Sequence, residues 1–240
     1  MSMSSLKDKV VIITGAVGNL GRAVAGRVQA LGGKTVLVDR SSDRLREAYG
    51  ELKGSAQRWL AGDVDMIDPK AVNAMVAEAY KRFGRLDGLV NTVGGFRGGK
   101  PVHESDLAEW DFLYDINVRT ALHACRAVIP YMLKAQSGRI INVASRNAFQ
   151  GSPNYAAYSA AKTAVLRLTE NLAGELKTRG INVNCIVPGT IDTPQNREAM
   201  PKADFSTWVP PEDLAHVVAF LLSDEARSVT GAAVPVYGRS

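Results

Sequence analysis

The chain has 240 residues, 46% of them apolar, and contains no linker or repeat, so we expect one domain spanning residues 1–240. Its formal net charge is +5, but 29 basic residues are scattered among 24 acidic ones without forming a run, which argues against a nucleic-acid partner. The start, MSMSSLKDK, has no apolar signal region and the following apolar run is too short to span a bilayer, which predicts a cytoplasmic protein without a membrane partner.

The first predicted strand, KVVIIT, leads directly into the glycine-rich turn GAVGNLG and then into the helical pattern RAVAGRVQAL. Gly15 permits a tight turn, Gly18 lets the backbone approach a pyrophosphate, and Gly21 lets the helix pack closely on the sheet. The N-terminus of that helix then faces the anion. This context on both sides of the glycines predicts a dinucleotide-binding turn.

The second predicted strand, TVLVD, ends in Asp39, about twenty residues beyond the glycine turn. A carboxylate at this position can accept hydrogen bonds from an adenosine ribose, which favours NAD(H). Arg40 follows directly and could instead neutralise a 2′-phosphate, so NADP(H) remains an alternative. An Asp–Arg pair that is merely solvated is the third interpretation.

Short apolar runs alternate with longer helical patterns along the rest of the chain: RWLAGD, LDGLVN, RIINVAS, INVNCIVP and AAVPVY. This alternation predicts an α/β fold, a single doubly wound, mostly parallel, seven-stranded sheet with helices on both faces. Pro235 removes a hydrogen-bond donor from the last strand, which should make that strand short or place it at an edge. Pro130 lies inside the helical pattern AVIPYMLKA and should kink or restart that helix.

Ligands of such sheets bind beyond the carboxyl ends of the strands. The candidate residues that fall there are Gly15 to Gly21, Asp39, Asp63, Asn91, Ser145 and Pro188. We therefore expect the chemistry to converge on one edge of the sheet.

The stretch YSAAK places Tyr158 and Lys162 four residues apart, on one face of a helix. A fixed ammonium beside a phenol favours the phenolate and should lower the pKa of the tyrosine toward a working range. Ser145, at the polar end of RIINVAS, offers a hydroxyl that could hold a carbonyl oxygen. Together the three predict carbonyl or alcohol redox chemistry with Tyr158 as general acid and base. The alternative is a half-buried helix with a snorkelling lysine.

Neither the cysteines nor the histidines predict a metal site or a nucleophile. Cys125 and Cys185 both lie in apolar surroundings, where packed thiols are expected in preference to a disulfide. His103, His123 and His216 are widely separated and are interpreted as surface or packing residues. We expect no metal.

These motifs together resemble the short-chain dehydrogenase/reductase family over nearly the whole chain, which implies one NAD(P)-binding Rossmann domain. Asn117 in DINV joins Ser145, Tyr158 and Lys162 as a catalytic tetrad, in which Asn117 would hold a proton-relay water and Lys162 the nicotinamide ribose. Tyr155 is excluded from the tetrad because it lacks the lysine at the right spacing. The family also implies a homotetramer or homodimer built on two long helices, 106–135 and 155–178.

The resemblance extends to the cofactor site. Asp63-Val64 resembles the family's adenine contact, NTVGG its NNAG segment, and PGTIDT the segment around the nicotinamide, with Thr193 at the carboxamide. The cofactor-binding residues so implied are Gly15, Gly18, Asn19, Leu20, Gly21, Asp39, Arg40, Asp63, Val64, Asn91, Val93, Gly94, Tyr158, Lys162, Pro188, Gly189, Ile191 and Thr193.

Several departures from the family pattern resemble its dihydropteridine reductase branch. They include GGFRGG in the fourth-strand loop and DTPQNREAMPKADFSTW from Asp192. The leading hypothesis is hydride transfer between nicotinamide and a carbonyl or secondary alcohol, such as a 3-oxoacyl thioester or a small ketone. The alternative is NADH-dependent reduction of a quinonoid pterin, which needs an oxyanion-stabilising Ser145 less. A non-catalytic dinucleotide sensor is the third hypothesis.

The sequence locates a small-molecule pocket only in outline. The aromatic residues could sandwich a flat ring, and an arginine could meet a phosphate or carboxylate. The segment 190–208, with its prolines and mixed polarity, is predicted to be a substrate lid. The candidate pocket residues are Phe96, Arg97, Arg146, Asn147, Phe149, Phe205 and Trp208.

Overall fold

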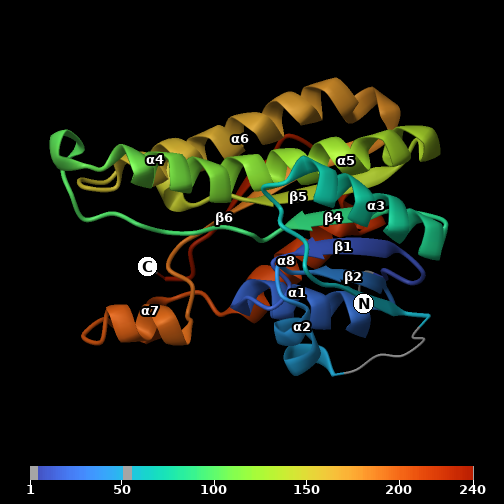
Figure 1. Cartoon of the computed structure of the whole chain (residues 1–240), viewed down its shortest axis with the longest axis horizontal. Coiled ribbons are helices and arrows are strands. Elements are labelled where there is room, and N and C mark those ends of the chain that lie inside the picture. Colours follow the sequence, from blue (N-terminus) through green and yellow to red (C-terminus); the bar gives the residue numbers. More distant parts are fainter. Residues whose placement is uncertain (1–4, 51–55, 240) are drawn as a thin grey trace.

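The computed structural model describes residues 5–50 and 56–239, and its core is one parallel sheet (Figure 1). Within the described residues the sheet has seven strands in the order β3-β2-β1-β4-β5-β6-β7, and every pair is parallel. The doubly wound, seven-stranded α/β fold predicted from the alternating pattern is confirmed. The strands are β1 (Val10–Thr14), β2 (Lys34–Val38), β3 (Arg58–Ala61), β4 (Gly88–Asn91), β5 (Gly138–Val143), β6 (Ile181–Pro188) and β7 (Ala233–Val236).

Helices cover both faces of the sheet, as expected (Figure 1). The residues of β1 are all buried, and they alternate between two apolar cores. Val11 and Ile13 face α1, α2 and α8, whereas Val10 and Ile12 face α3, α5 and α6. The bounds are α1 (Asn19–Ala30), α2 (Ser42–Tyr49), α3 (Pro69–Phe83), α4 (Leu107–Tyr114), α5 (Thr120–Ala135), α6 (Ala156–Leu176), α7 (Pro194–Ala199) and α8 (Pro211–Leu222).

The two prolines singled out in the sequence have different outcomes. Pro235 lies in β7, which is short and pairs only with β6 among the described strands, so the prediction of an edge strand is confirmed. Pro130 does not restart its helix, because α5 runs through it without a break. Its position is exposed, so water can reach the carbonyl that the proline leaves without a partner.

The expected long helix over 106–135 is interrupted upstream of Pro130 instead. A five-residue π-helical segment, Asp115–Arg119, joins α4 to α5. Such segments are frequent at functional sites. This one contains Asn117.

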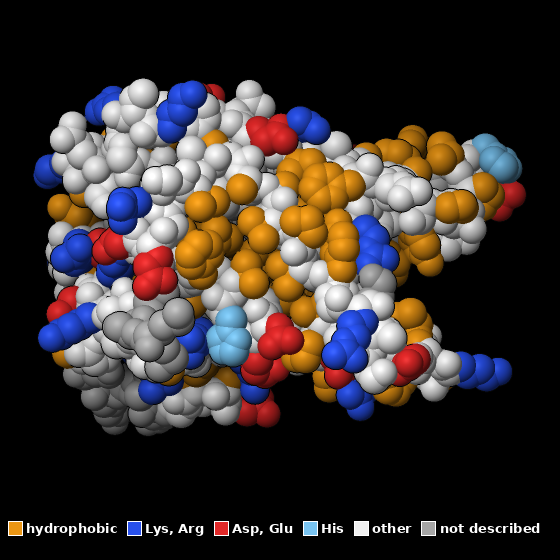
Figure 2. Space-filling model, turned by 180° about the vertical axis from the view of Figure 1, so that it is seen from behind, with side chains coloured by type: hydrophobic (Ala, Val, Ile, Leu, Met, Phe, Trp, Pro, Cys, Tyr) orange, Lys and Arg blue, Asp and Glu red, His pale blue; other side chains and the backbone are white. Residues whose placement is uncertain are grey.

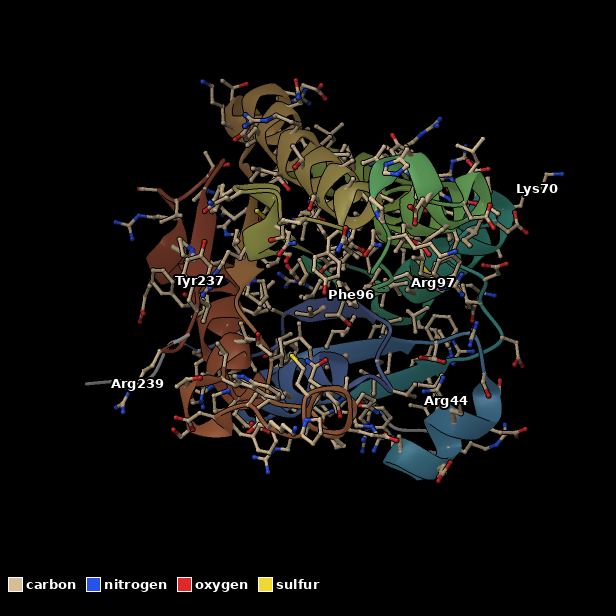
Figure 3. The ribbon with its side chains drawn as sticks, turned by 90° about the vertical axis from the view of Figure 1, so that its left-hand side faces the viewer. Arg44, Lys70, Phe96, Arg97, Tyr237 and Arg239 are labelled. Atoms are coloured by element: carbon tan, nitrogen blue, oxygen red, sulfur yellow. The ribbon has the colours of Figure 1, made fainter. Side chains whose placement is uncertain are left out.

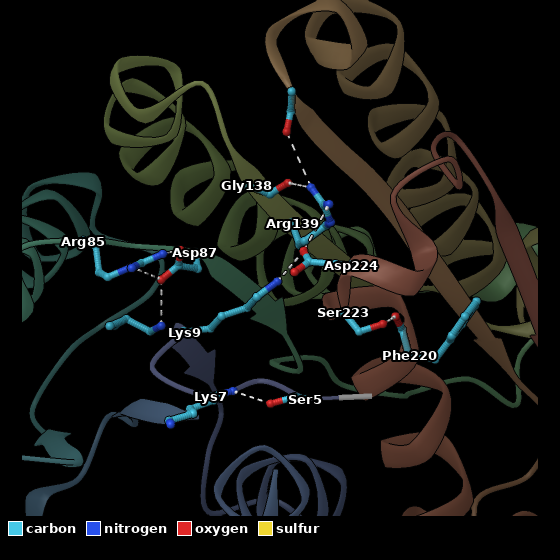
Figure 4. A network of polar contacts seen from close by, with 12 residues as sticks. Ser5, Lys7, Lys9, Arg85, Asp87, Gly138, Arg139, Phe220, Ser223 and Asp224 are labelled. Carbon is cyan, nitrogen blue, oxygen red and sulfur yellow. Dashed lines mark hydrogen bonds and ion pairs between the residues drawn. The ribbon is translucent and has the colours of Figure 1, made fainter. Parts of the chain in front are cut away.

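A polar network fixes the amino ends of the strands (Figure 4). The Lys9 ammonium lies 2.6 Å from the Asp224 carboxylate, and the Arg139 guanidinium lies 3.9 Å from the same carboxylate. Arg85 donates two hydrogen bonds to Asp87, which also accepts one from the main-chain N–H of Val10. These contacts lie at the sheet edge opposite the candidate site, so we assign them a structural role.

Both cysteines are free and buried, as the sequence predicts. In the part of the chain that the structure describes, no helix is both long enough and apolar enough to cross a membrane.

Candidate active site

Asn117 anchors the loop that follows β4. Its side chain is 2% exposed, and its amide group donates hydrogen bonds to the carbonyl oxygens of Leu113 and Gly95, both at 2.9 Å. Its Oδ1 accepts one from the main-chain N–H of Gly95 at 3.2 Å. Both amide hydrogens are therefore used to hold the helix and the loop together. The proton-relay water expected at Asn117 stays a prediction.

Ser145, Tyr158 and Lys162 come together from two elements. Ser145 follows β5, and its hydroxyl accepts a hydrogen bond from the main-chain N–H of Asn147 and forms another with Tyr158. Tyr158 lies in the first turn of α6 and Lys162 one turn later. The Lys162 ammonium donates to the carbonyl of Val143 at 3.0 Å and lies 5.9 Å from the centroid of the Tyr158 ring.

Gly94 lies between two of the candidate catalytic residues, Asn117 and Lys162. A Cβ atom at Gly94 would lie 3.0 Å from Asn117 Oδ1 and 3.3 Å from Lys162 Nζ. Only a residue without a side chain leaves this space open. Residues that follow the carboxyl ends of β4 and β5 therefore lie near residues of the π-helical segment and α6.

The electrostatics differ from the sequence-based expectation. Burial raises the pKa of Tyr158, and the hydrogen bond with Ser145 opposes this rise. Burial also lowers the pKa of Lys162 to about 8, because its ammonium is removed from water. The expected lowering of the tyrosine pKa by Lys162 is therefore wrong for this arrangement. The lysine points to the Val143 carbonyl, and Ser145 is the neighbour that favours the phenolate.

The glycine turn leaves an open helix N-terminus. Gly15 has φ of +64°, and a Cβ at Gly21 would collide with the Gly15 carbonyl oxygen, so the predicted tight turn and close packing are present. Gly18 is the N-cap of α1, which has no side-chain cap and no acidic residue in its first turn among the described residues. Side chains cap α2, α3, α4 and α7, whereas α6 and α8, like α1, begin without a side-chain cap. The N–H groups at the start of α1 follow the glycine turn and can bind a phosphate there.

Asp39 supplies a second indication of a ligand. Its side chain is 7% exposed, yet its Oδ1 has no hydrogen-bond partner within residues 5–50 and 56–239. The Arg44 guanidinium lies 3.9 Å away, whereas Arg40 is exposed. A buried carboxylate oxygen normally finds a donor, and a ribose hydroxyl would provide one.

Asp63 and Val64, expected at the adenine, are engaged within the chain. Asp63 has φ of +57°, and its carboxylate accepts hydrogen bonds from the main-chain N–H of Ser42 at 3.1 Å and the Ser42 hydroxyl at 2.6 Å. The main-chain N–H of Val64 donates to the carbonyl of Asp39 at 3.2 Å. The structure therefore gives this pair a clear structural role beside β2 and α2.

Asn91 faces the interior of the sheet. It is 4% exposed and donates to Asn142 Oδ1 at 2.9 Å, and Asn142 donates in turn to the Thr169 hydroxyl. The following residue, Thr92, donates through its hydroxyl to the carbonyl of Thr14 at 2.5 Å and so ties β4 to the glycine turn. Sequence reasoning missed Thr92, Asn142 and Thr169. An asparagine within the apolar run RIINVAS was the available signal.

The segment 190–208 projects from the molecule, and main-chain hydrogen bonds join its two ends. The main-chain N–H of Asp192 donates to the carbonyl of Val209, and the N–H of Val209 donates to the carbonyl of Thr190. Arg197 donates two hydrogen bonds to Asp192 and lies over the ring of Phe205. Whether this segment moves as a lid stays a prediction.

Helix α7, within this segment, lies against the glycine turn. The Thr193 hydroxyl accepts from the main-chain N–H of Asn196 and caps α7, and Asn19 donates to Gln195 Oε1 at 2.9 Å. Pro188 ends β6, and the main-chain N–H of Gly189 donates to the carbonyl of Val236. The end of β6, α7 and the start of α1 therefore lie close together at the carboxyl ends of the strands.

The predicted pocket residues fall into two groups. Phe96 contacts Tyr158 and is 60% exposed, and Phe149 is also exposed. Arg97 instead lies over the ring of Phe112, and Arg146 lies over the ring of Tyr237. Trp208 is 7% exposed and packs on Phe205 within the segment 190–208.

The open side of the molecule is hollowed and apolar. Figure 2 shows hydrophobic side chains gathered along a hollow between two projecting parts, α7 and the segment that leads into α4. Phe96 lies between these parts in Figure 3. The hollow therefore leads to the carboxyl edge of the sheet, where the candidate catalytic residues meet.

Comparisons with known proteins agree with this geometry. The model of the short chain dehydrogenase family matches residues 9–204. The chain is 36% identical to levodione reductase of Leifsonia aquatica over 96% of this chain and 93% of the relative, and 31% identical to a 3-oxoacyl-(acyl-carrier-protein) reductase of Thermotoga maritima over 97% and 98%. A crystal structure of levodione reductase superposes with a TM-score of 0.88, at 34% identity and 97% coverage of both chains.

Proposed function

The chain belongs to the short-chain dehydrogenase family of oxidoreductases, and from this premise we propose that it interconverts a carbonyl and a secondary alcohol with NAD(P). The observation that carries the proposal is the grouping of Ser145, Tyr158 and Lys162 at the carboxyl edge of the sheet. The substrate class is a small ketone or a 3-oxoacyl thioester. Relatives named as a levodione reductase and a 3-oxoacyl-(acyl-carrier-protein) reductase support this choice.

The residues would act on the substrate oxygen. When bound, the dinucleotide supplies or accepts the hydride. In reduction, the Tyr158 hydroxyl gives its proton to the substrate oxygen, and the Ser145 hydroxyl hydrogen-bonds the same oxygen where negative charge develops. In oxidation Tyr158 takes the proton back. The Lys162 ammonium lies between Val143 and Gly94, where it can bind a ribose hydroxyl, and the Ser145 hydroxyl is the neighbour that stabilises the deprotonated tyrosine.

The cofactor would be held by the glycine turn Gly15–Gly21, Asp39 and Lys162, with Thr193 and the end of β6 on the nicotinamide side. The open N-terminus of α1 suits the pyrophosphate. Asp39 Oδ1, which accepts no hydrogen bond from the described residues, suits a ribose hydroxyl, and the carboxylate would repel a 2′-phosphate. NAD(H) is therefore the proposed cofactor, and NADP(H) is the alternative through Arg40 or Arg44.

Replacing Asp39 should change the cofactor preference. Asp39→Ala removes a charged hydrogen-bond acceptor from the ribose, so we expect NADH to bind roughly 10- to 100-fold more weakly while NADPH binds as well or better. Titrations of nicotinamide fluorescence give both dissociation constants. Asp43→Ala, which removes an exposed carboxylate from neighbouring α2, is the matched control and should change neither. A wild-type protein that binds NADPH more tightly than NADH would contradict the proposed preference.

The proposed function is tested by single-turnover oxidation of NADH and NADPH with 3-oxoacyl thioesters, small ketones and quinonoid dihydropterin as separate substrates. Turnover of a ketone or thioester supports the proposal. Activity confined to the pterin would replace it with the dihydropteridine reductase hypothesis, which rests on the segment from Asp192. Cofactor binding without turnover of any substrate would favour a dinucleotide sensor. We also propose a homotetramer or homodimer built on α4–α5 and α6, which light scattering can test.

A further inference from the structure

Two residues of the loop between β4 and α4 lie between two points at which the loop is tied by hydrogen bonds or close packing to the rest of the molecule. On one side, Gly95 exchanges two hydrogen bonds with the buried Asn117 side chain. On the other side, the main-chain N–H of Gly99 donates to the carbonyl of Asn154 at 2.9 Å. A Cβ at Gly98 would collide with the Tyr155 ring, so the backbone packs directly on that ring. The two residues between these anchors are Phe96 and Arg97.

The Phe96 ring is fixed but largely uncovered. It meets the Tyr158 ring edge-on, with the centroids 5.0 Å apart and the planes at 84°, and it lies 5.3 Å from the Tyr155 ring. It is nevertheless 60% exposed. An exposed phenylalanine usually has no fixed orientation, whereas two ring contacts and an anchored backbone give this one a defined orientation. In Figure 3 Phe96 lies between the two projecting parts that flank the hollow.

We propose that Phe96 is a specificity-determining residue that selects substrates carrying a planar ring next to the reacting carbonyl. The ring of such a substrate would stack on the exposed face of Phe96 while its oxygen reaches the Tyr158 hydroxyl. Tyr155, which has no lysine four residues later, supports the Phe96 ring by contacting both that ring and Gly98. The inference rests on the proposed function, because it assumes that the carbonyl reacts at Tyr158.

Planarity can be separated from size with two ketones. Acetophenone and cyclohexyl methyl ketone have the same carbon skeleton around the carbonyl, but only the first has a flat ring. Phe96→Leu keeps an apolar side chain and removes the stacking surface. We expect it to lower the ratio of kcat/KM for acetophenone to that for cyclohexyl methyl ketone by roughly two- to twelvefold, the range that an aromatic contact supplies.

Two further variants make the comparison specific. Phe96→Trp restores a flat ring and should recover the ratio. Phe220→Leu, which removes a phenylalanine that is 42% exposed on α8, is the matched control and should leave the ratio unchanged. Dissociation constants for NADH should be the same in all four proteins, which shows that the cofactor site is intact.

Calorimetric titration of acetophenone into the NAD⁺-loaded protein gives a readout that does not need turnover. We expect Phe96→Leu to weaken this binding by the same factor as the loss in kcat/KM. An unchanged ratio and unchanged binding in an active Phe96→Leu enzyme would overturn the inference and leave the proposed function standing. Failure of the proposed function has a different signature, since turnover would then be absent in the wild-type protein or would persist in Tyr158→Phe.

Discussion

Tyr158→Phe should lower kcat by roughly 100- to 10,000-fold, because it removes the hydroxyl that we propose exchanges a proton with the substrate oxygen. Tyr158 forms a hydrogen bond with Ser145 and lies one helical turn before Lys162. Phenylalanine keeps the ring that packs against Phe96, so the fold and the loop after β4 should be preserved. Stopped-flow absorbance of the nicotinamide under single-turnover conditions measures the chemical step directly.

NADH should still bind to Tyr158→Phe, because cofactor binding involves no proton transfer. A fluorescence titration measures this binding. Tyr155→Phe is the matched control, since Tyr155 stands three positions earlier and contacts the same Phe96 ring. It should retain near-normal kcat. Near-full turnover in Tyr158→Phe, or an equal loss in Tyr155→Phe, would refute the assignment of Tyr158 as the acid and base.

Lys162→Met should abolish turnover and, at neutral pH, stabilise the protein without bound dinucleotide. The Lys162 side chain is 5% exposed, and burial lowers its pKa from 10.5 to about 8. Keeping a buried ammonium below pH 8 therefore costs up to about 3 kcal/mol of the free energy of unfolding. The hydrogen bond to the Val143 carbonyl offsets part of the gain when methionine replaces the lysine.

The pH dependence identifies the cause of that stabilisation. Between pH 8 and 10.5 the unfolded chain keeps the Lys162 proton while the folded chain has released it, so the stability contributed at this site rises with pH. The advantage of Lys162→Met over the wild type should therefore be largest at pH 7 and should shrink as the pH approaches 10. Urea unfolding of both proteins at four pH values measures this difference in the free energy of unfolding. The contributions of the other titrating groups cancel, because both proteins contain them.

Lys177→Met, which removes an exposed lysine just beyond α6, controls for the change in net charge. A difference between Lys162→Met and wild type that stays constant from pH 7 to 10 would show that the buried ammonium is not its source. Saturating NADH should reverse the order of stability, because a cation that binds the ribose is present only in the wild type.

The sequence located most of the candidate site because its chemistry is encoded in short spacings. Tyr158 and Lys162 share a helix face, and Gly15 to Gly21 span one strand–turn–helix unit. The geometry of such short segments depends little on the rest of the chain. The prediction that failed concerns the direction of the tyrosine pKa, since burial and the choice of partner for Lys162 depend on β5, which lies elsewhere in the chain.

The sequence by itself determined the order of strands and helices, the edge position of Pro235, the glycine turn and the lysine that follows Tyr158, because hydrophobic period, proline chemistry and helical spacing are local properties. Only the tertiary structure decided that Tyr155 supports Phe96, that Asp63 holds Ser42, and that a π-helical turn aims Asn117 at Gly95. Each of these contacts joins segments that are brought together by the parallel sheet. The physical reason is that such pairings follow from packing across the whole sheet edge, which no local pattern encodes.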